Sequence, residues 1–319
     1  MPNTKTKKTI VLAETLKTKN FIFANEYDID KNGKEFIKKI GIGYTGMKES
    51  DLVPASGRKY RYDGQKLHVL FRGPLVPADE AHFPKFKKVD GQRPNGYYSF
   101  GMSPKYTYKT TGIDKSPENI SGYQFHVSLS DSEYKLGDDT PLTKPFDTIK
   151  KAVCKYLSAN KKRLPKAFKS MDEEELLACV KPIYVPGKLN KKTDKVYGPS
   201  LYATVKHWKN NELGERVTTI IKTHDQAEPI EQVADIEDPF GLHNVNGRVI
   251  FQLVLDNVTF YSNDKIDVIS IRCELGYVRY HKLESQQEDD GMGEFEDEDD
   301  DDFDDIDPTV DYGDNAENS

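Results

Sequence analysis

Residues 246–283 read NGRVIFQLVLDNVTFYSNDKIDVISIRCELGYVRYHKL, the most strand-like stretch of the chain. β-branched and aromatic residues fill two long runs, and Asn263-Asp264 lies between them, which is typical of two strands joined by a turn. In the second run Val268 and Ile269 are adjacent apolar residues, and this break in the alternation predicts a bulge or bend near Ile269. We therefore expect the chain's final pair of long strands here.

Shorter runs with strand signals precede this pair. Alternating or wholly apolar segments bounded by turn residues predict strands, and two such runs flank Asp63-Gly64, which is a hairpin signal. In residues 122–130 the alternation places Phe125 or Tyr123 inward. The segments expected to form strands are 9–12, 20–24, 36–44, 58–73, 122–130, 201–208 and 217–223.

Between these strand groups the hydrophobic period changes to that of helices. In residues 144–163 the apolar positions recur every three or four residues, which predicts an amphipathic helix that ends before Pro165. A second helix is expected from Ser170, because Ser170 and Glu173 have capping-box spacing, and it stops before Pro182. This pattern favours a mainly β fold with inserted helices, a barrel or sandwich, over a parallel sheet.

Charge divides the chain into two parts. Residues 284–319 contain 18 acidic residues and no Lys or Arg, so we expect a disordered acidic tail. Residues 1–283 contain the other 35 acidic residues and all 46 basic residues, so their net charge is +11. A single basic domain over 1–283 is typical of a protein that binds an anionic polymer, and the acidic tail can compete with that polymer for the same groove. The alternative is that the tail only increases solubility.

Composition and motifs exclude several classes of protein. The three cysteines are odd in number and widely spaced, and no apolar run is long enough to cross a membrane, so an intracellular location, in the nucleus or at a viral replication site, is expected rather than secretion. No catalytic or metal-binding motif occurs, and we expect no enzyme activity, cofactor or metal. Asp235, Glu237 and Asp238 could bind a nuclease metal, but an acidic loop explains them better.

Three stretches combine rings with positive charge, the pairing that binding of a single nucleic-acid strand requires. Lysine and arginine contact phosphates, and aromatic rings stack on bases of any sequence. The three stretches are residues 58–72, 85–109 and 188–209. The second lies within residues 74–111, which are rich in Pro and Gly and are expected to be an irregular binding loop. The candidate residues are Arg58, Tyr60, Arg61, Lys87, Lys88, Arg93, Tyr97, Tyr106, Lys191, Lys192, Tyr197, Tyr202, Lys206 and Trp208.

The third stretch gives the most specific expectation. In a half-buried strand, Tyr202, Lys206 and Trp208 share one face. The lysine indicates that this face is exposed to solvent. Trp208, the single tryptophan, would then be a stacking platform. The alternative is that these rings pack in a barrel core with their polar tips at the surface, and that the lysine runs are solvated loops.

Residues 180–283, about a third of the chain, together with the acidic tail that follows them, resemble a known family. The KPIY segment at 181–184, the lysine-rich loop, GPSLYATVK at 198–206, DPFGL at 238–242, the final long strands and the acidic tail are similar to the single-stranded-DNA-binding proteins of T-odd podophages and large nucleo-cytoplasmic DNA viruses. The resemblance implies an OB barrel with inserted helices that binds single strands without sequence preference. It also implies homodimers formed by tail exchange, and a tail that contacts a DNA polymerase or helicase.

One feature departs from that family. Its phage members end in an aromatic residue, whereas this chain ends in Ser319 with Phe303 and Tyr312 further in, so a role for a terminal ring does not carry over. The alternative function is a protein-interaction module, such as an acidic-tailed chaperone for basic nucleoproteins. RNA in place of DNA is a third possibility, because stacking and phosphate contacts do not sense the 2′-OH group.

Overall fold

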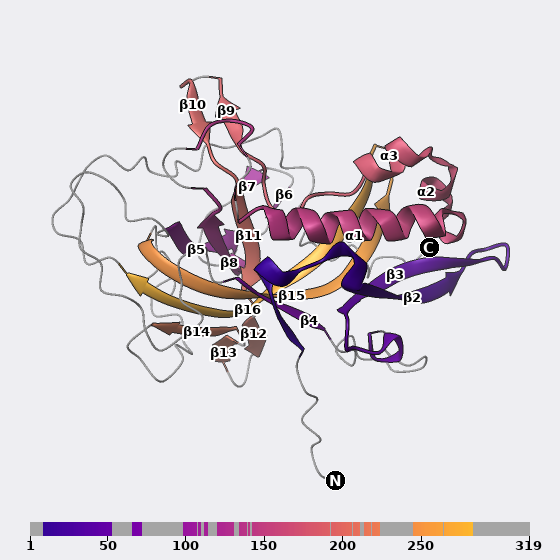
Figure 1. Cartoon of the computed structure of the whole chain (residues 1–319), viewed down its shortest axis with the longest axis horizontal. Coiled ribbons are helices and arrows are strands. Elements are labelled where there is room, and N and C mark those ends of the chain that lie inside the picture. The colour runs from indigo at the N-terminus through magenta and orange to yellow at the C-terminus, as the bar shows by residue number, and fades with distance from the viewer. Residues whose placement is uncertain are drawn as a thin grey trace, which may run out of the picture.

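A computed structural model shows a large, bent β structure with helices on one side (Figure 1). Of its strands, β15 (Val245–Ser262) and β16 (Asp267–Lys282) are the longest. The residues that the structure describes are 9–52, 66–71, 98–106, 108–109, 112–113, 120–130, 134–138, 140, 142–191, 193–205, 207–210, 214–217, 219–223, 245–263 and 265–282.

Strands β15 and β16 form the long antiparallel pair that the sequence predicts. The turn between them is closed by Asn263, whose side-chain oxygen accepts hydrogen bonds from the backbone N–H groups of Lys265 and Ile266. The bulge expected near Ile269 is wrong, because Ile269 pairs in regular register with Phe260. On the other edge of β16, the Ile269 N–H donates to the Cys179 carbonyl oxygen and the Ile269 carbonyl oxygen accepts from the Lys181 N–H. The Ile269 side chain is fully buried there without a bulge.

The irregularities lie elsewhere in the pair. Asp256 and Asn257 together oppose Arg272, and Gly276 is an extra residue in β16. A side chain at Gly276 would come within 2.8 Å of Val254, so glycine permits the close approach of the strands there. These two bulges increase the local twist and accompany the bend of both strands in Figure 1.

The other strands pair along the free edges of β15 and β16. On the β15 side lie β3, β4 and β5, and on the β16 side lie β11 and β14. Strand β8 lies between β5 and β11, so pairings connect β15, β5, β8, β11 and β16 in a circuit. Their bounds are β3 (Glu35–Tyr44), β4 (Leu67–Phe71), β5 (Tyr98–Tyr106), β8 (Ile120–Ser128), β11 (Ser200–Val205) and β14 (Ile220–Thr223).

Smaller elements complete the β structure. Strand β1 pairs with β4 in parallel, β2 forms a hairpin with β3, and three two-stranded sheets lie outside the main sheet. Their bounds are β1 (Ile10–Leu12), β2 (Phe21–Ile29), β6 (Tyr108–Lys109), β7 (Gly112–Ile113), β9 (Lys188–Asn190), β10 (Lys195–Tyr197), β12 (His207–Asn210) and β13 (Gly214–Val217). Short 3-10 turns occupy Ala13–Thr15, Thr18–Asn20 and Glu49–Asp51.

Strand β5 corrects one prediction. Its residues belong to the stretch expected to be an irregular binding loop, yet they form a strand between β15 and β8, and Phe100 and Met102 are completely buried. Pro104 is tolerated because β15 pairs with β5 only over residues 98–100, so its missing N–H breaks no hydrogen bond with β15. The recurring Pro and Gly concealed the alternation of Phe100 and Met102.

The helices follow the predicted order but differ in their limits. Helix α1 (Lys144–Asn160) is the amphipathic helix, followed by a 3-10 turn (Lys161–Arg163), α2 (Lys166–Ser170) and α3 (Glu173–Ala178). The predicted cap at Ser170 is wrong, because Ser170 ends α2 and bonds back to Ala167. Asp172 caps α3 instead, in a reciprocal capping box with Glu175, which has the same three-residue spacing.

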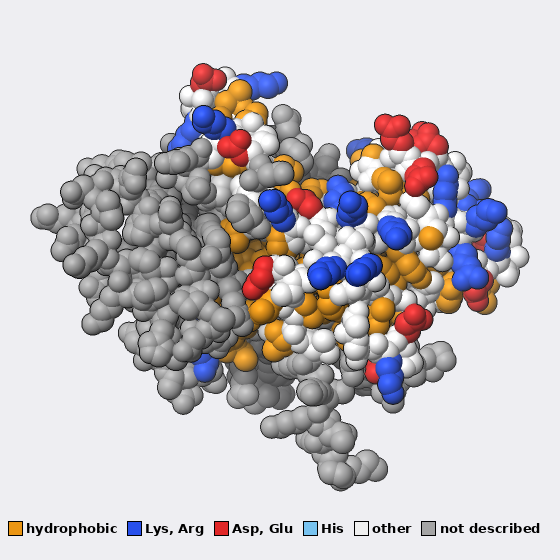
Figure 2. All heavy atoms as spheres, in the orientation of Figure 1, with side chains coloured by type: hydrophobic (Ala, Val, Ile, Leu, Met, Phe, Trp, Pro, Cys, Tyr) orange, Lys and Arg blue, Asp and Glu red, His pale blue; other side chains and the backbone are white. Residues whose placement is uncertain are grey.

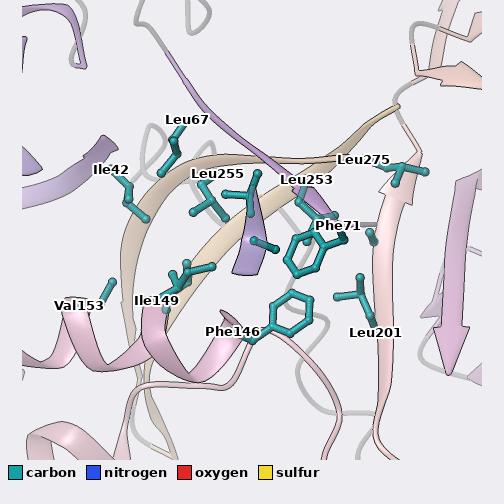
Figure 3. Close-up of a cluster of buried hydrophobic side chains, with 14 of the residues drawn as sticks. Ile42, Leu67, Phe71, Phe146, Ile149, Val153, Leu201, Leu253, Leu255 and Leu275 are labelled. Carbon is teal, nitrogen blue, oxygen red and sulfur yellow. The ribbon is translucent and has the colours of Figure 1, made fainter. Parts of the chain in front are cut away.

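One aromatic stack joins helix and sheet. The Phe71 ring of β4 lies 4.7 Å from Phe146 of α1 and 4.8 Å from Phe251 of β15, nearly parallel to both. Figure 3 shows Phe71 and Phe146 within the buried cluster that α1, β4, β11 and β15–β16 enclose. The mainly β fold with few helices is therefore as expected, whereas the predicted turn at Asp63-Gly64 lies outside the described residues.

Replacing Phe71 with Ala should lower the free energy of unfolding by about 3–5 kcal/mol, because it removes the middle ring of the stack and leaves a cavity. Chemical denaturation of the purified protein measures this change. Ile29→Ala is the control, since Ile29 is 66% exposed on β2, and should stay within about 0.5 kcal/mol of the parent. A loss below about 1 kcal/mol for Phe71→Ala would contradict this packing.

Candidate nucleic-acid interface

Strand β11 has one buried face and one outer face. Leu201, Ala203 and Val205 are at most 1% exposed, whereas Tyr202 between them is 42% exposed. This alternation is the one predicted for the strand, with the Tyr202 side on the wet face. An exposed ring on a rigid strand is a suitable stacking surface for an unpaired base, although its ligand role stays a prediction.

The neighbouring strand β8 extends this face. His126 pairs directly with Tyr202, their rings lie 6.3 Å apart, and Gln124 pairs with Thr204. All of these except Tyr202 are half-buried. We call Gln124, His126, Tyr202 and Thr204 the β8–β11 outer face. His126 was missed from the sequence, although β8 alternates regularly and places it with the polar residues.

A basic hairpin leads into β11. Its strands β9 and β10 protrude from the upper edge of the molecule in Figure 1. Lys188 pairs with Tyr197, and the Lys195 ammonium group lies 5.3 Å from the centre of the Tyr197 ring. Lys191 is exposed at the hairpin turn. Cations and a ring therefore occur a few residues before Tyr202 in the chain.

The turn of this hairpin has a defined backbone. Asp194 has a φ of 57°, and its N–H donates to the Asn190 carbonyl oxygen at 2.8 Å. Asp and Asn tolerate this left-handed conformation better than most residues. Below the hairpin, Val185 and Ser200 exchange two backbone hydrogen bonds, which fix the base of the hairpin beside the start of β11.

The structure describes the side chains of only some predicted site residues. Lys191, Tyr197 and Tyr202 follow one another along the hairpin and β11. Tyr106 ends β5 opposite Ile120 of β8. Ile120 is six residues from His126 along β8, so Tyr106 lies about 20 Å from the β8–β11 outer face. Trp208 belongs to β12, which pairs with β13 in a sheet separate from that of β11, so the structure does not place Trp208 and Tyr202 on one strand face as predicted. The residues outside the described part are Arg58, Tyr60, Arg61, Lys87, Lys88, Arg93, Tyr97, Lys192 and Lys206.

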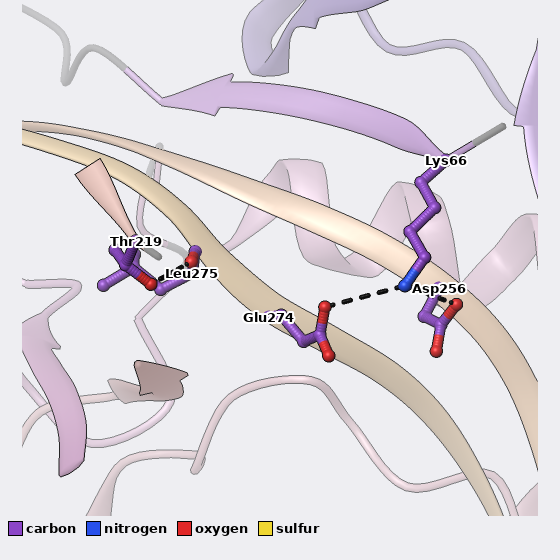
Figure 4. A network of polar contacts seen from close by, with 5 residues as sticks. All are labelled: Lys66, Thr219, Asp256, Glu274 and Leu275. Atoms are coloured by element: carbon purple, nitrogen blue, oxygen red, sulfur yellow. Dashed lines mark hydrogen bonds and ion pairs between the residues drawn. The ribbon is translucent and has the colours of Figure 1, made fainter. Parts of the chain in front are cut away.

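A polar cluster joins the start of β4 to β15 and β16, and its geometry is that of an ion pair. The Lys66 ammonium group lies 3.0 Å from Asp256 and 3.7 Å from Glu274 (Figure 4). Nearby, the buried Thr219 hydroxyl donates to the Leu275 carbonyl oxygen at 2.7 Å. Lys66 is shared by two carboxylates beside the bulges of β15 and β16 and offsets part of their charge, so these contacts stabilise the strand junction.

The cysteines do not have the character of nucleophiles. Burial, with a smaller effect from the neighbouring Glu274 carboxylate, raises the pKa of Cys273 to about 12. Burial also raises the pKa of Cys154 and of Cys179. A thiol with a raised pKa is protonated at neutral pH and reacts poorly. All three cysteines are free of disulfides.

The described residues contain neither a metal-binding cluster nor a membrane-spanning helix. No group of three or more His, Cys, Asp or Glu lies there in a position to hold a metal ion. In the same part of the chain, no helix is long and apolar enough to cross a membrane. Asp235, Glu237 and Asp238, the weaker metal candidates, lie outside it.

These features define a mainly β protein with an exposed ring on a strand face and a basic hairpin beside it. A comparison with models of protein families finds no match to the chain, and a comparison with curated protein sequences finds none either.

Replacing Lys66 with Met should lower the free energy of unfolding by about 2–3 kcal/mol, because two partly buried carboxylates lose their shared cation. Thermal or urea unfolding measures the change. Lys38→Met is the matched control, since the Lys38–Asp28 pair also has a distance of 3.0 Å but is about half exposed and is worth about 0–1 kcal/mol. Equal losses in the two variants would contradict a special role for the Lys66 cluster.

Proposed function

We propose that the protein is a non-enzymatic, sequence-independent single-stranded-DNA-binding protein that acts in viral-type DNA replication, recombination or repair. The observation that carries the proposal is the β8–β11 outer face, where Tyr202 is exposed on a rigid strand and continues from a basic hairpin. Rings stack on any base and lysines pair with any phosphate, so such a surface needs no particular sequence.

The circuit of strand pairings supports an OB-like barrel. Numbered in chain order, β5, β8, β11, β15 and β16 occur around the circuit in the order 1, 2, 3, 5, 4. The β11–β16 pairing is parallel and the other four are antiparallel. An OB fold is a five-stranded, partly open Greek-key barrel that binds oligonucleotides on strands 2 and 3. Here those strands are β8 and β11.

Charge supports an anionic ligand. Residues 1–283 carry a net charge of +11, and the 18 acidic residues are concentrated in residues 284–319. A positive body attracts phosphates over a distance, and binding releases the counterions of the nucleic acid. The acidic tail competes with DNA for this positive body and recruits a basic surface of a replication partner such as a polymerase or helicase.

The tail also favours a second candidate function. A polyanionic segment with no Lys or Arg can hold basic nucleoproteins, as expected for a chaperone or another protein-interaction module. Such a protein would bind a basic protein tightly and single-stranded DNA only weakly. The exposed ring beside the basic hairpin favours DNA binding, because a chaperone acting through its tail does not need it.

Replacing Tyr202 with Ala should weaken binding to a short single-stranded oligonucleotide by about 5- to 100-fold, since one stacked base contributes about 1–3 kcal/mol. Fluorescence anisotropy of a labelled oligonucleotide measures the affinity. Tyr27→Ala is the control, because Tyr27 is similarly exposed at 38% but lies on β2, and it should bind as the parent does. Unchanged affinity for Tyr202→Ala would remove that ring from the site.

Deleting residues 284–319 should raise the affinity for single-stranded DNA several-fold, because the competing polyanion is lost. The measurement is a gel-shift series with single-stranded DNA, duplex DNA and RNA, with and without the tail, at two salt concentrations. Affinity should fall steeply with salt in both forms. Equal affinity with and without the tail contradicts competition, and weak binding to every nucleic acid favours the chaperone function.

A further inference from the structure

The helical segment after β8 has a strongly positive surface. Residues 144–170 contain nine Lys and Arg and a single acidic residue, Asp147. Figure 2 shows blue side chains gathered over the face that α1 covers and at the end of the molecule near α2. We call the nine cations the cationic helix face: Lys144, Lys150, Lys151, Lys155, Lys161, Lys162, Arg163, Lys166 and Lys169.

These cations are not neutralised within the described structure. The ion pairs found there join Lys38 to Asp28 and Lys66 to Asp256 and Glu274, and none includes the cationic helix face. Arg163 donates a hydrogen bond to the uncharged Tyr27 hydroxyl. The acidic residues that follow, 172–175, belong to α3, where Asp172 and Glu175 cap the helix.

A cation from another element adds to this surface. The pKa of Lys169 on α2 is lowered chiefly because the Lys34 amine from the β2–β3 turn lies beside it, while the Asp30 carboxylate opposes the shift. Two amines held close together repel each other when both are charged, and an anion between them relieves that repulsion. Lys34 at the β2–β3 turn therefore adds a positive charge to this surface, where Asp30 supplies one carboxylate.

The aromatic residues of segment 144–170 are buried or packed on β2, and the exposed ring beside the cationic helix face, Tyr27 of β2, has its hydroxyl bonded to Arg163. Phe146 and Phe168 are buried, at 1% exposure each. Tyr156 stacks on Phe23 at 4.5 Å and donates its hydroxyl hydrogen to Asn25. Many cations beside one part-exposed ring fit a polymer of carboxylates better than a row of unpaired bases.

We propose that the cationic helix face is the intramolecular dock of the acidic tail, residues 284–319. The charges are complementary, with 18 acidic residues and no basic ones on the tail against nine basic and one acidic residue in the segment. The tail begins directly after β16 and its 36 residues reach up to about 120 Å when extended. Tethering gives it a high effective concentration near the helices.

This inference deepens the proposed function by giving the tail a location away from the β8–β11 outer face. A docked tail cancels part of the positive field that attracts DNA, so it lowers DNA affinity without occupying the ring-bearing face. Several exposed pairs acting together supply the contact, since each one alone contributes little. The dock should therefore release the tail at high salt.

Zero-length carbodiimide cross-linking of the full-length protein, followed by peptide mass spectrometry, tests the dock without DNA. It joins lysines to carboxylates in contact, so tail cross-links should concentrate on the cationic helix face. In the variant Lys151→Gln, Lys155→Gln, Lys162→Gln, Lys166→Gln, cross-links to the retained Lys144, Lys150, Lys161 and Lys169 should fall at least about fivefold. The control variant Lys188→Gln, Lys191→Gln, Lys195→Gln in the basic hairpin should keep them.

Three outcomes would overturn the inference. Tail cross-links that concentrate on the basic hairpin would place the tail there. In a mixture of isotope-labelled and unlabelled protein, cross-links chiefly between chains would assign the face to the tail of a second copy. The four-lysine variant of the cationic helix face could also keep its cross-links at the retained lysines and lose as much single-stranded-DNA affinity as the hairpin variant. That result would make the cationic helix face a nucleic-acid surface. Failure to bind DNA at all would refute the proposed function but leave the cross-linking result intact.

Discussion

The long antiparallel pairing of β15 with β16 is the constraint on which the rest of the fold depends. One edge of β15 pairs in turn with β5, β4 and β3, and the outer edge of β16 pairs with β11 and β14. Straight strands of this length would keep their neighbours far apart. The bulges at Asp256–Asn257 and at Gly276 accompany the bend, and β5, β8 and β11 connect the two edges.

Surface chemistry is divided between two parts of this framework. The β8–β11 outer face has an exposed ring with a basic hairpin beside it, and the cationic helix face concentrates charge on helices whose own aromatic residues are not exposed. This difference follows from the elements. A strand that alternates exposes every second side chain, whereas α1 buries Phe146, packs Tyr156 on Phe23 of β2 and exposes long cationic side chains such as Lys151 and Lys155.

Local patterns predicted much of the fold. The final strand pair, the β2–β3 runs, the amphipathic helix and the alternation of β11 follow from periodicities of two or about four residues, which a few neighbouring side chains determine. The bulge expected near Ile269 was wrong because the residues that cover it, around Val180, are distant in sequence. Strand β5 was missed because its neighbours β15 and β8, rather than its own composition, hold it in the sheet.

The sequence by itself determined the mainly β class, the order of strands and helices, and the separation of a basic body from an acidic tail, because these depend on composition and short-range spacing. Only the tertiary structure decided that His126 lies opposite Tyr202, that Lys34 meets Lys169, and that Lys66 joins two carboxylates. Each of these contacts joins residues dozens of positions apart or more. Strand register and helix docking create such contacts, and no local pattern encodes them.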